Sequence, residues 1–299
     1  MTKSTRSDIP IRLRILDGGH MLLDGGTMFG VIPRVNWQKL IPPDEQNRIR
    51  LACWCVLAEI GEKRVLIEAG LGDKYSEKER SIYGLTGSWV APALEAVGVS
   101  CDSIDQIILT HLHFDHAGGL TRFNGELPDE GPQQLVFPNA EVVVQDGEWR
   151  DALDNYSTTR SSYRTEELEP VRDAGKLKLV NGDVEIGGGI RVRVTPGHTR
   201  YHQSVILTGP NRTACFVGEL LPTVYHARPA YQMAYDVLPI ETMRSKAALM
   251  QKAEADNWLL ILDHDPDHPA VTVSRDERTR FALTDAADHN DVLSDWVNL

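Results

Sequence analysis

The sequence predicts an α/β (α+β) fold in which helices pack in layers on mixed β-sheets. Short β-branched runs, separated by Gly or Asn turns, fill much of the second half of the chain. A helical apolar pattern lies between some of these runs, which favours sheets covered by helices. We find no linker rich in Pro, Gly or Ser, so we expect one domain over residues 1–299.

The N-terminal part is predicted to begin with a half-buried strand at 11–16, followed by turns at Asp17-Gly18-Gly19 and Asp24-Gly25-Gly26. Residues 28–47 carry three prolines and little periodicity, which predicts an irregular loop. Phe29 and Trp37 lie in this loop and are candidates for the wall or lid of a pocket.

Regular elements are easier to predict further along the chain. Strands at 51–60 and 64–68 form a hairpin closed by Gly61-Glu62. A helix at 90–97 ends before Gly98, and the polar stretch 155–172 is expected to face solvent as a helix or insertion. Further strands are predicted at 107–109 and 141–145, the latter followed by a helix at 146–153.

Most of the elements predicted for the second half of the chain are strands. They are expected at 177–180, 184–186, 190–195, 204–207, 214–217 and, as the final buried strand, 258–262. A helix at 240–255 begins after Pro239, and its predicted buried stripe consists of Ile240, Met243, Ala247 and Met250.

Charge and composition exclude several classes of partner. The chain has 31 Lys and Arg against 43 Asp and Glu, a net charge of -12, which argues against nucleic acid and against an anionic membrane surface. No apolar run has the length of a membrane span, and the polar N-terminus lacks the apolar region of a signal peptide. With only four cysteines, we expect reduced thiols and a cytoplasmic protein, with homo-oligomerisation left open.

The strongest chemical signal is Thr110-His111-Leu112-His113-Phe114-Asp115-His116-Ala117-Gly118-Gly119, directly after the apolar run 107–109. Residues two apart in an extended segment point the same way, so His111 and His113 can share one ion. A turn at Gly118-Gly119 would then swing Asp115 and His116 towards a second, nearby point. Imidazole and carboxylate ligands suit zinc, with iron and manganese as rivals.

Three other strand ends present ligand-type side chains. His198 follows the strand at 190–195, Glu219 follows 214–217, and Asp263-His264-Asp265 follows 258–262. Sites are commonly built from loops at one edge of a sheet. His268 is a rival to His264 but lies further into a Pro-flanked loop.

These motifs resemble the metallo-β-lactamase fold superfamily, whose His-x-His-x-Asp-His signature corresponds to residues 111–116. The resemblance covers about residues 50 to 265 and implies a four-layer αβ/βα sandwich with two metals at one edge. It implies one ion held by His111, His113 and His198. The second would be held by Asp115, His116 and His264, with Glu219 shared between the two.

The implied chemistry is hydrolysis. Zinc lowers the pKa of bound water to about 7, so hydroxide is available near neutral pH. Asp115 is expected to orient the nucleophile and move its proton. The family usually has Asp where this chain has Glu219, so the carboxylate can bridge differently or leave the second site weak. His202 is either a hydrogen-bond partner of a ligand or a purely structural residue.

The segment after Glu219 resembles lactonase-like and organophosphate-hydrolysing relatives. Tyr225 and His226, together with Phe29, are therefore candidate substrate-binding residues. The first hypothesis is a dinuclear metal hydrolase for a small ester or lactone, extending to phosphotriesters. The alternatives are a β-lactam or thioester hydrolase, an iron-dependent redox enzyme, and a binding or sensor protein without turnover.

Overall fold

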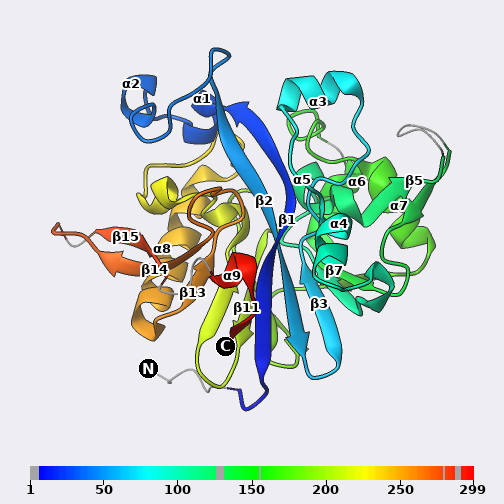
Figure 1. The fold of residues 1–299 in the computed structure, drawn as a ribbon. Helices are drawn as coiled ribbons and strands as arrows, with labels where there is room; N and C mark the ends of the chain where they lie inside the picture. Colours follow the sequence, from blue (N-terminus) through cyan, green and yellow to red (C-terminus); the bar gives the residue numbers. More distant parts are fainter. Residues whose placement is uncertain (1–6, 126–130, 155, 279, 287–290) are drawn as a thin grey trace. The chain divides into compact units, whose positions relative to one another are not determined.

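The computed structural model describes residues 7–125, 131–154, 156–278, 280–286 and 291–299 (Figure 1). The chain forms two compact units. The first unit contains Met1–Arg14, Leu23–Leu51 and Asp183–Leu299, and the second contains Ile15–Leu22 and Ala52–Gly182. The single-domain assignment stays a prediction, and residues 1–6 of the polar N-terminus, with Asn155, lie outside the described residues.

The second unit is built on a mixed sheet with the order β1-β2-β3-β4-β7-β8. Its strands are β1 (Ile11–Asp24), β2 (Arg48–Ile60), β3 (Lys63–Ile67), β4 (Gln106–Ile108), β7 (Glu141–Gln145) and β8 (Leu177–Val180). The β2–β3 hairpin is antiparallel, as predicted, and Gly61 takes the positive φ of its turn. The pairs from β3 to β8 are parallel. The first residues of β1 belong to the first unit and pair with β16 (Val297–Asn298).

Helices and a small hairpin complete the second unit. These are α3 (Glu77–Tyr83), α4 (Val90–Ala96), α5 (Phe114–Ala117), α6 (Asp146–Asp154), α7 (Thr165–Asp173), the 3-10 turns η1 (Cys101–Ser103) and η2 (Gly118–Leu120), and the strands β5 (Thr121–Phe123) and β6 (Gln133–Leu135). Helix α6 packs beside β7 and β8, whereas α7 packs on β5 and β6 (Figure 1). Ser76 and Glu79 form a capping box that fixes the start of α3.

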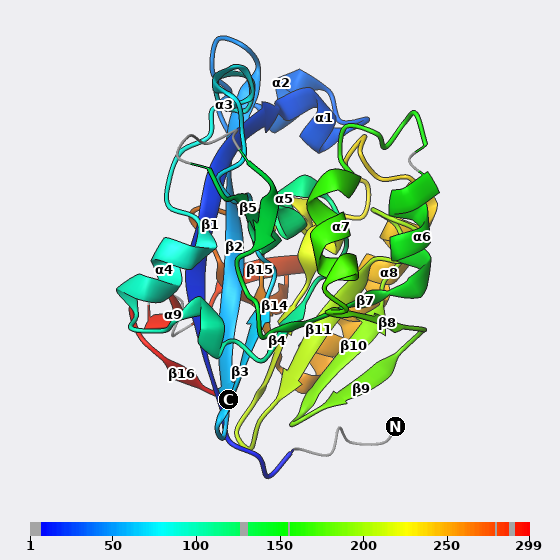
Figure 2. The ribbon, with the colours of Figure 1, turned by 90° about the vertical axis from the view of Figure 1, so that its right-hand side faces the viewer.

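The first unit has its own sheet, with the order β15-β14-β13-β12-β11-β10-β9. The strands are β9 (Val184–Gly187), β10 (Ile190–Val194), β11 (Gln203–Thr208), β12 (Thr213–Phe216), β13 (Leu259–Ile261), β14 (Ala270–Arg275) and β15 (Phe281–Asp285). Only the β12–β13 pair is parallel among these described strands. Figure 2 shows β9, β10 and β11 side by side.

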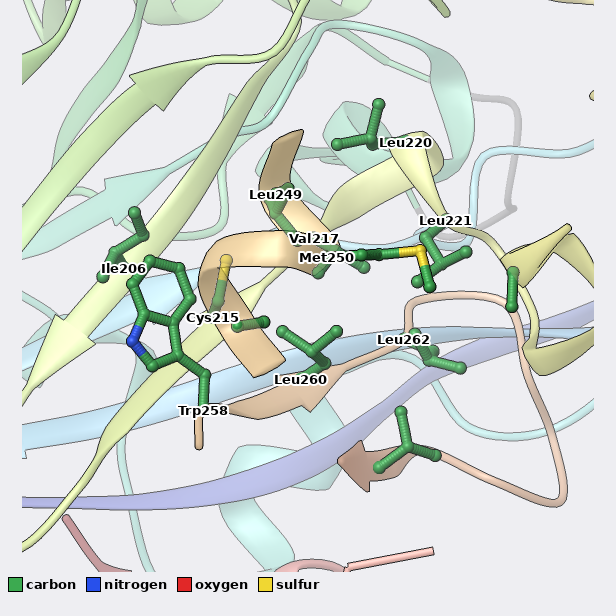
Figure 3. Close-up of a cluster of buried hydrophobic side chains, with 13 residues drawn as sticks. Ile206, Cys215, Val217, Leu220, Leu221, Leu249, Met250, Trp258, Leu260 and Leu262 are labelled. Atoms are coloured by element: carbon green, nitrogen blue, oxygen red, sulfur yellow. The ribbon is translucent and has the colours of Figure 1, made fainter. Parts of the chain in front are cut away.

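A buried apolar cluster joins this sheet to α8 (Pro239–Asp256). Trp258 directly precedes β13, Leu260 lies within β13, and Leu249 and Met250 come from α8 (Figure 3). Full burial of such side chains contributes roughly 1.5–3 kcal/mol each. The cluster therefore holds β12 and β13 in place, and these strands are followed by the polar residues Glu219 and His264. The unit also contains α1 (Gly25–Phe29), α2 (Arg34–Trp37), α9 (Asp291–Ser294), η3 (Gly218–Leu220) and η4 (Val224–Ala227).

The turn predicted at Asp17-Gly18-Gly19 is wrong, because β1 runs without interruption from Ile11 to Asp24. A Cβ on Gly18 would lie 2.4 Å from the carbonyl oxygen of Cys53 and 2.7 Å from Sγ of Cys55. The glycine therefore permits close approach of the backbone to its neighbours, and it does not end the strand.

The predicted buried stripe of α8 is confirmed only at Met250. Ile240 is 59% exposed, and the buried residues are Thr242, Lys246, Leu249, Met250 and Ala253. Lys246 is buried because its ammonium donates to the carbonyls of Arg228 and Tyr231. Apolar periodicity could not find this face, since two of its five buried residues are polar.

Three more predictions need correction. Strand β13 is not the final strand, because β14 and β15 follow; their partly exposed, Thr- and Ser-containing sequences hid them. Residues 28–47 are not wholly irregular, since α1 extends to Phe29 and α2 begins at Arg34. Within 156–172, Leu168 and Val171 of α7 are buried, so that stretch does not simply face solvent.

Candidate metal centre

The second unit brings four of the predicted ligands together. The ring centroids of His111 and His113 lie 4.4 Å apart. Helix α5 begins immediately after His113 and carries Asp115 and His116. The ring of His116 lies 4.1 Å from that of His111, and its Nε2 lies 3.7 Å from Oδ2 of Asp115. All four side chains are buried, so three imidazoles and a carboxylate share a small buried volume.

Gly118 and Gly119 do not form the turn that the sequence predicted, and they are needed for a different reason. The chain changes direction at the start of α5, before Gly118-Gly119, and neither glycine has a positive φ. A Cβ on Gly118 would lie 2.2 Å from the carbonyl oxygen of Leu71, and one on Gly119 would lie 2.0 Å from that of Ala69. The pair is required because two backbone segments touch here.

Partners that sequence patterns did not reveal orient these ligands. The hydroxyl of Thr110 lies 3.0 Å from Nδ1 of His111. Glu68 accepts a hydrogen bond from the Thr110 amide at 2.8 Å, and its other oxygen lies 3.4 Å from Nδ1 of His116. Such contacts fix the ring orientation of a metal-binding histidine. The only signal for Glu68 in the sequence was its place at the end of a predicted strand.

Buried Glu148 supports the same loop from α6. Its Oε1 accepts hydrogen bonds from the amide of Leu112 at 3.2 Å and from the hydroxyl of Tyr163 at 2.7 Å. The ring of Tyr163 packs edge-on against His113, with the centroids 4.7 Å apart. This carboxylate therefore joins the His111–His113 backbone to a segment 50 residues away in the chain.

The first unit brings together the other three predicted ligands. His198 lies in the turn after β10, Glu219 in η3 after β12, and His264 in the loop after β13. Nε2 of His198 lies 2.5 Å from Oε2 of Glu219, and Nε2 of His264 lies 3.3 Å from Oε1 of the same carboxylate. The side chains of all three are at most 6% exposed. Glu219 thus faces both imidazoles, one with each oxygen.

Asp236 is a ligand partner that sequence reasoning missed. Its Oδ1 lies 3.2 Å from Nδ1 of His198, and the amides of Val237 and Leu238 donate to the carbonyls of His198 and Gly197. Burial lowers the pKa of His198, but the carboxylates of Glu219 and Asp236 outweigh it and raise that pKa to about 10. This position favours a positive charge.

Two neighbouring histidines have other contacts. His202 is buried, and its Nδ1 lies 2.9 Å from the hydroxyl of Thr195 at the base of the β10–β11 turn. His268, the rival to His264, is partly exposed and its Nδ1 lies 2.7 Å from Oδ1 of Asp285. The backbone amide of His264 instead donates to the carbonyl of Pro222, which places its side chain beside Glu219.

The three candidate substrate-binding residues differ in exposure. Phe29 is fully buried and stacks between Trp37, at 5.5 Å, and His226, at 5.1 Å. Nε2 of His226 donates to the carbonyl of Met28, and its Nδ1 accepts from the hydroxyl of Thr223. Tyr225 remains partly exposed. Contact of any of them with substrate stays a prediction, and the first two have clear packing roles.

The donor atoms within each unit fit a divalent metal. The second unit offers three imidazoles and one carboxylate, and the first offers two imidazoles and one carboxylate. Nitrogen and carboxylate oxygen donors are those that zinc binds, and iron and manganese also accept them. The hydrogen bonds at Nδ1 of His111 and His198 leave Nε2 of each ring to face its neighbouring ligands.

Comparison with known proteins now identifies the family. The sequence profile of the metallo-beta-lactamase superfamily matches residues 48–280. The chain belongs to the metallo-β-lactamase superfamily. The predicted His-x-His-x-Asp-His signature lies within the matched region, as do His198, Glu219 and His264. The two large sheets with their helices confirm the predicted mixed α/β fold of this family.

Several members of the superfamily are similar to this chain. It is 28% identical to an N-acyl homoserine lactonase of Bacillus cereus over 173 residues, which are 54% of this chain and 60% of that protein. The match thus spans about three fifths of that relative. It is 23% identical to the N-acyl homoserine lactonase AttM of Rhizobium radiobacter, over 87% of this chain and 82% of AttM.

Solved structures extend the likeness to nearly the whole chain. A probable metal-dependent hydrolase from Staphylococcus aureus has 28% identity and a TM-score of 0.83, with 95% of this chain and 99% of that chain covered. AidC, a dizinc quorum-quenching lactonase whose structure contains a product, has 19% identity and a TM-score of 0.76, covering 96% and 97%. AidC supports the fold assignment alone. Among the described residues, no helix is long and apolar enough to cross a membrane.

Proposed function

We propose that this protein is a dinuclear metal-dependent hydrolase that opens lactones or cleaves small esters. The observation that carries the proposal is the pair of buried sets of histidines and carboxylates, one in each unit, within the region that the superfamily profile matches. The similarity to N-acyl homoserine lactonases supports a lactone as the first substrate to test. Small esters and phosphotriesters are the next classes.

In this proposal His111, His113 and His198 would hold one ion, and Asp115, His116 and His264 would hold the second. Glu219 belongs to both groups of candidate ligands. Two divalent ions would supply a nucleophilic water of lowered pKa and polarise the scissile carbonyl.

The protein's own residues orient these ligands and move the proton. Asp115 accepts the proton of the attacking water and returns it towards the leaving oxygen. Glu68 and Asp236 keep the rings of His116 and His198 in fixed orientations.

The charges of the ligand sets support a cationic cofactor. Glu219 and Asp236 both lie against His198, and Asp115 and Glu68 both lie against His116. Several buried carboxylates in close proximity are costly unless cations compensate them. Divalent ions would provide that compensation while leaving the imidazoles neutral.

Elemental analysis of purified protein, paired with a substrate panel, tests the proposal. The panel contains N-acyl homoserine lactones of several acyl lengths, simple lactones, aryl esters, a phosphotriester, a thioester and a β-lactam. We expect two equivalents of zinc or manganese and the highest kcat/KM on a lactone. Bound iron with oxygen consumption would contradict the hydrolase assignment. A protein that binds metal but turns over no member of the panel would indicate a binding or sensor role.

A further inference from the structure

The buried residue Lys74, which belongs to neither ligand set, contacts the backbone that follows the histidine motif in the sequence. Lys74 is only 6% exposed. Its Nζ donates hydrogen bonds to the carbonyls of Gly118 and Thr121 and lies 3.4 Å from Oε2 of Glu167. A lysine ammonium has three protons to donate, so these three acceptors account for all of them.

One acceptor of Lys74, the carbonyl of Gly118, lies at the end of the helix that carries two predicted ligands. Gly118 directly follows α5, which bears Asp115 and His116. The segment 69–74 also contacts this end through its backbone. The amide of Ala69 donates to the carbonyl of His116 at 2.8 Å, and the amide of Gly119 donates to the carbonyl of Gly70 at 3.0 Å. Lys74 is the side-chain part of this contact.

Lys74 adds a charged contact to this glycine segment. Because no Cβ fits at Gly118 or Gly119, the segment is held by its backbone hydrogen bonds and by donors from neighbouring residues. The carbonyls of Gly118 and Thr121 are placed where a charged donor from Lys74 reaches both. Hydrogen bonds from a charged donor are roughly twice as strong as neutral ones. The ammonium therefore fixes the position of the α5 end.

We propose that Lys74 is a positioning residue that sets Asp115 and His116 for the second metal ion, an inference that rests on the proposed function. Glu167 balances the buried charge of Lys74, and Arg164 lies 3.5 Å from the same carboxylate. A displacement of about 1 Å at a reacting site can cost roughly 100-fold in rate. Loss of the lysine donor would allow such a displacement of α5.

The test compares Lys74→Met with Lys78→Met in the full-length protein. Lys78 is an exposed lysine four residues further along the chain, in α3, and serves as the matched control. Chelator-competition titration with Zn²⁺ measures both binding steps. In Lys74→Met we expect one step to weaken about 10–100-fold, the range for residues that orient metal ligands. On the best lactone, kcat should fall while KM stays unchanged, and Lys78→Met should match the wild type.

A second variant separates positioning from stability. Lys74→Met removes one of the two cations beside the buried Glu167 and leaves only Arg164, so the Tm should fall. The double variant Lys74→Met/Glu167→Gln removes that carboxylate charge and should recover much of the Tm. The weakened Zn²⁺ step should persist, because the carbonyls of Gly118 and Thr121 still lack their donor. Lys74→Arg, which keeps the charge, should partly restore the Zn²⁺ affinity. Recovery of Zn²⁺ affinity together with the Tm in the double variant would overturn the proposal.

The outcomes also separate this inference from the proposed function. If the wild type binds two Zn²⁺ but hydrolyses nothing on the panel, the function fails and the titration still decides the role of Lys74. If the wild type is active and Lys74→Met keeps wild-type Zn²⁺ affinity and kcat, only the positioning role is overturned. A wild type that binds no Zn²⁺ overturns both.

Discussion

The two ligand sets differ in how the chain brings their members together. In the second unit, four ligands lie within six consecutive residues, and the start of α5 at Phe114 gathers them. In the first unit, His198, Glu219 and His264 come from three separate strand ends. The first arrangement is determined by local backbone geometry. The second exists only once the sheet has formed, so its geometry depends on remote partners such as Asp236.

We call the candidate ligands of the second unit, His111, His113, Asp115 and His116, the compact set. The largest effect should come from removing one of them. His113→Ala should lower kcat/KM on the best lactone by about 1,000-fold, the equivalent of roughly 4 kcal/mol. It should also reduce the metal bound per chain. His268→Ala is the control, because His268 is partly exposed and pairs with Asp285. Metal analysis and steady-state kinetics of both variants measure this. Equal losses in the two variants would mean that the ligand assignment is wrong.

The same difference explains what could be predicted from the sequence. The compact motif could be predicted because its candidate ligands are adjacent, and His198, Glu219 and His264 were predicted from their positions after apolar strands. Glu68, Glu148 and Asp236 were not, since nothing local distinguishes a buried carboxylate that reaches a distant ring. Their roles appear only when the chain has folded.

The fold was predictable to a similar extent and for similar reasons. The β2–β3 hairpin and the strand β7 were recognised because their apolar patterns and turn residues are local. The continuity of β1 through Gly18 was missed, because the close approach of Cys53 cannot be seen in the sequence. The buried face of α8 was missed because Thr242 and Lys246 are buried against loops.

We call the candidate ligands of the first unit, His198, Glu219 and His264, the dispersed set. This set should be more sensitive than the compact set to the loss of a remote partner. Asp236→Asn removes the carboxylate charge beside Nδ1 of His198 but retains the shape of the side chain. We expect Zn²⁺ affinity to weaken about 10–100-fold. Asp276→Asn, on the surface, is the control, because Asp276 pairs with Arg280. Chelator-competition titration measures both. Unchanged affinity in Asp236→Asn would show that the dispersed set does not depend on this partner.

A smaller effect is expected from shortening the carboxylate between the two histidines of the dispersed set. Glu219→Asp retracts the two oxygens that now face His198 and His264. We expect metal content to fall, or kcat to fall by about tenfold, which corresponds to roughly 1.4 kcal/mol in the activation free energy. Glu254→Asp, at the exposed pair with Arg275, is the matched control. If Glu219→Asp equals the wild type in both metal content and kcat, the carboxylate is not shared between two ions.

The smallest effect on catalysis should come from His226, which lies in the first unit but is assigned to neither ligand set. Burial lowers the pKa of His226 to about 3, and the charges of Lys246 and His264 add to this. The unfolded chain takes up a proton near pH 6.5, whereas the folded protein does not. His226 therefore reduces stability progressively as the pH falls from about 6.5 towards 3, and it has no such effect above that window.

The variant His226→Gln tests both this titration and the predicted contact with substrate. Glutamine retains a donor for the carbonyl of Met28 but cannot titrate, so the variant should lose less stability than the wild type between pH 6.5 and 4. Urea unfolding midpoints across that range measure the difference between the two proteins. KM and kcat at pH 7.5 should stay within about twofold of the wild type, because His226 is 1% exposed and bonded at both ring nitrogens. A large rise in KM with unchanged unfolding midpoints would instead place this ring against the substrate.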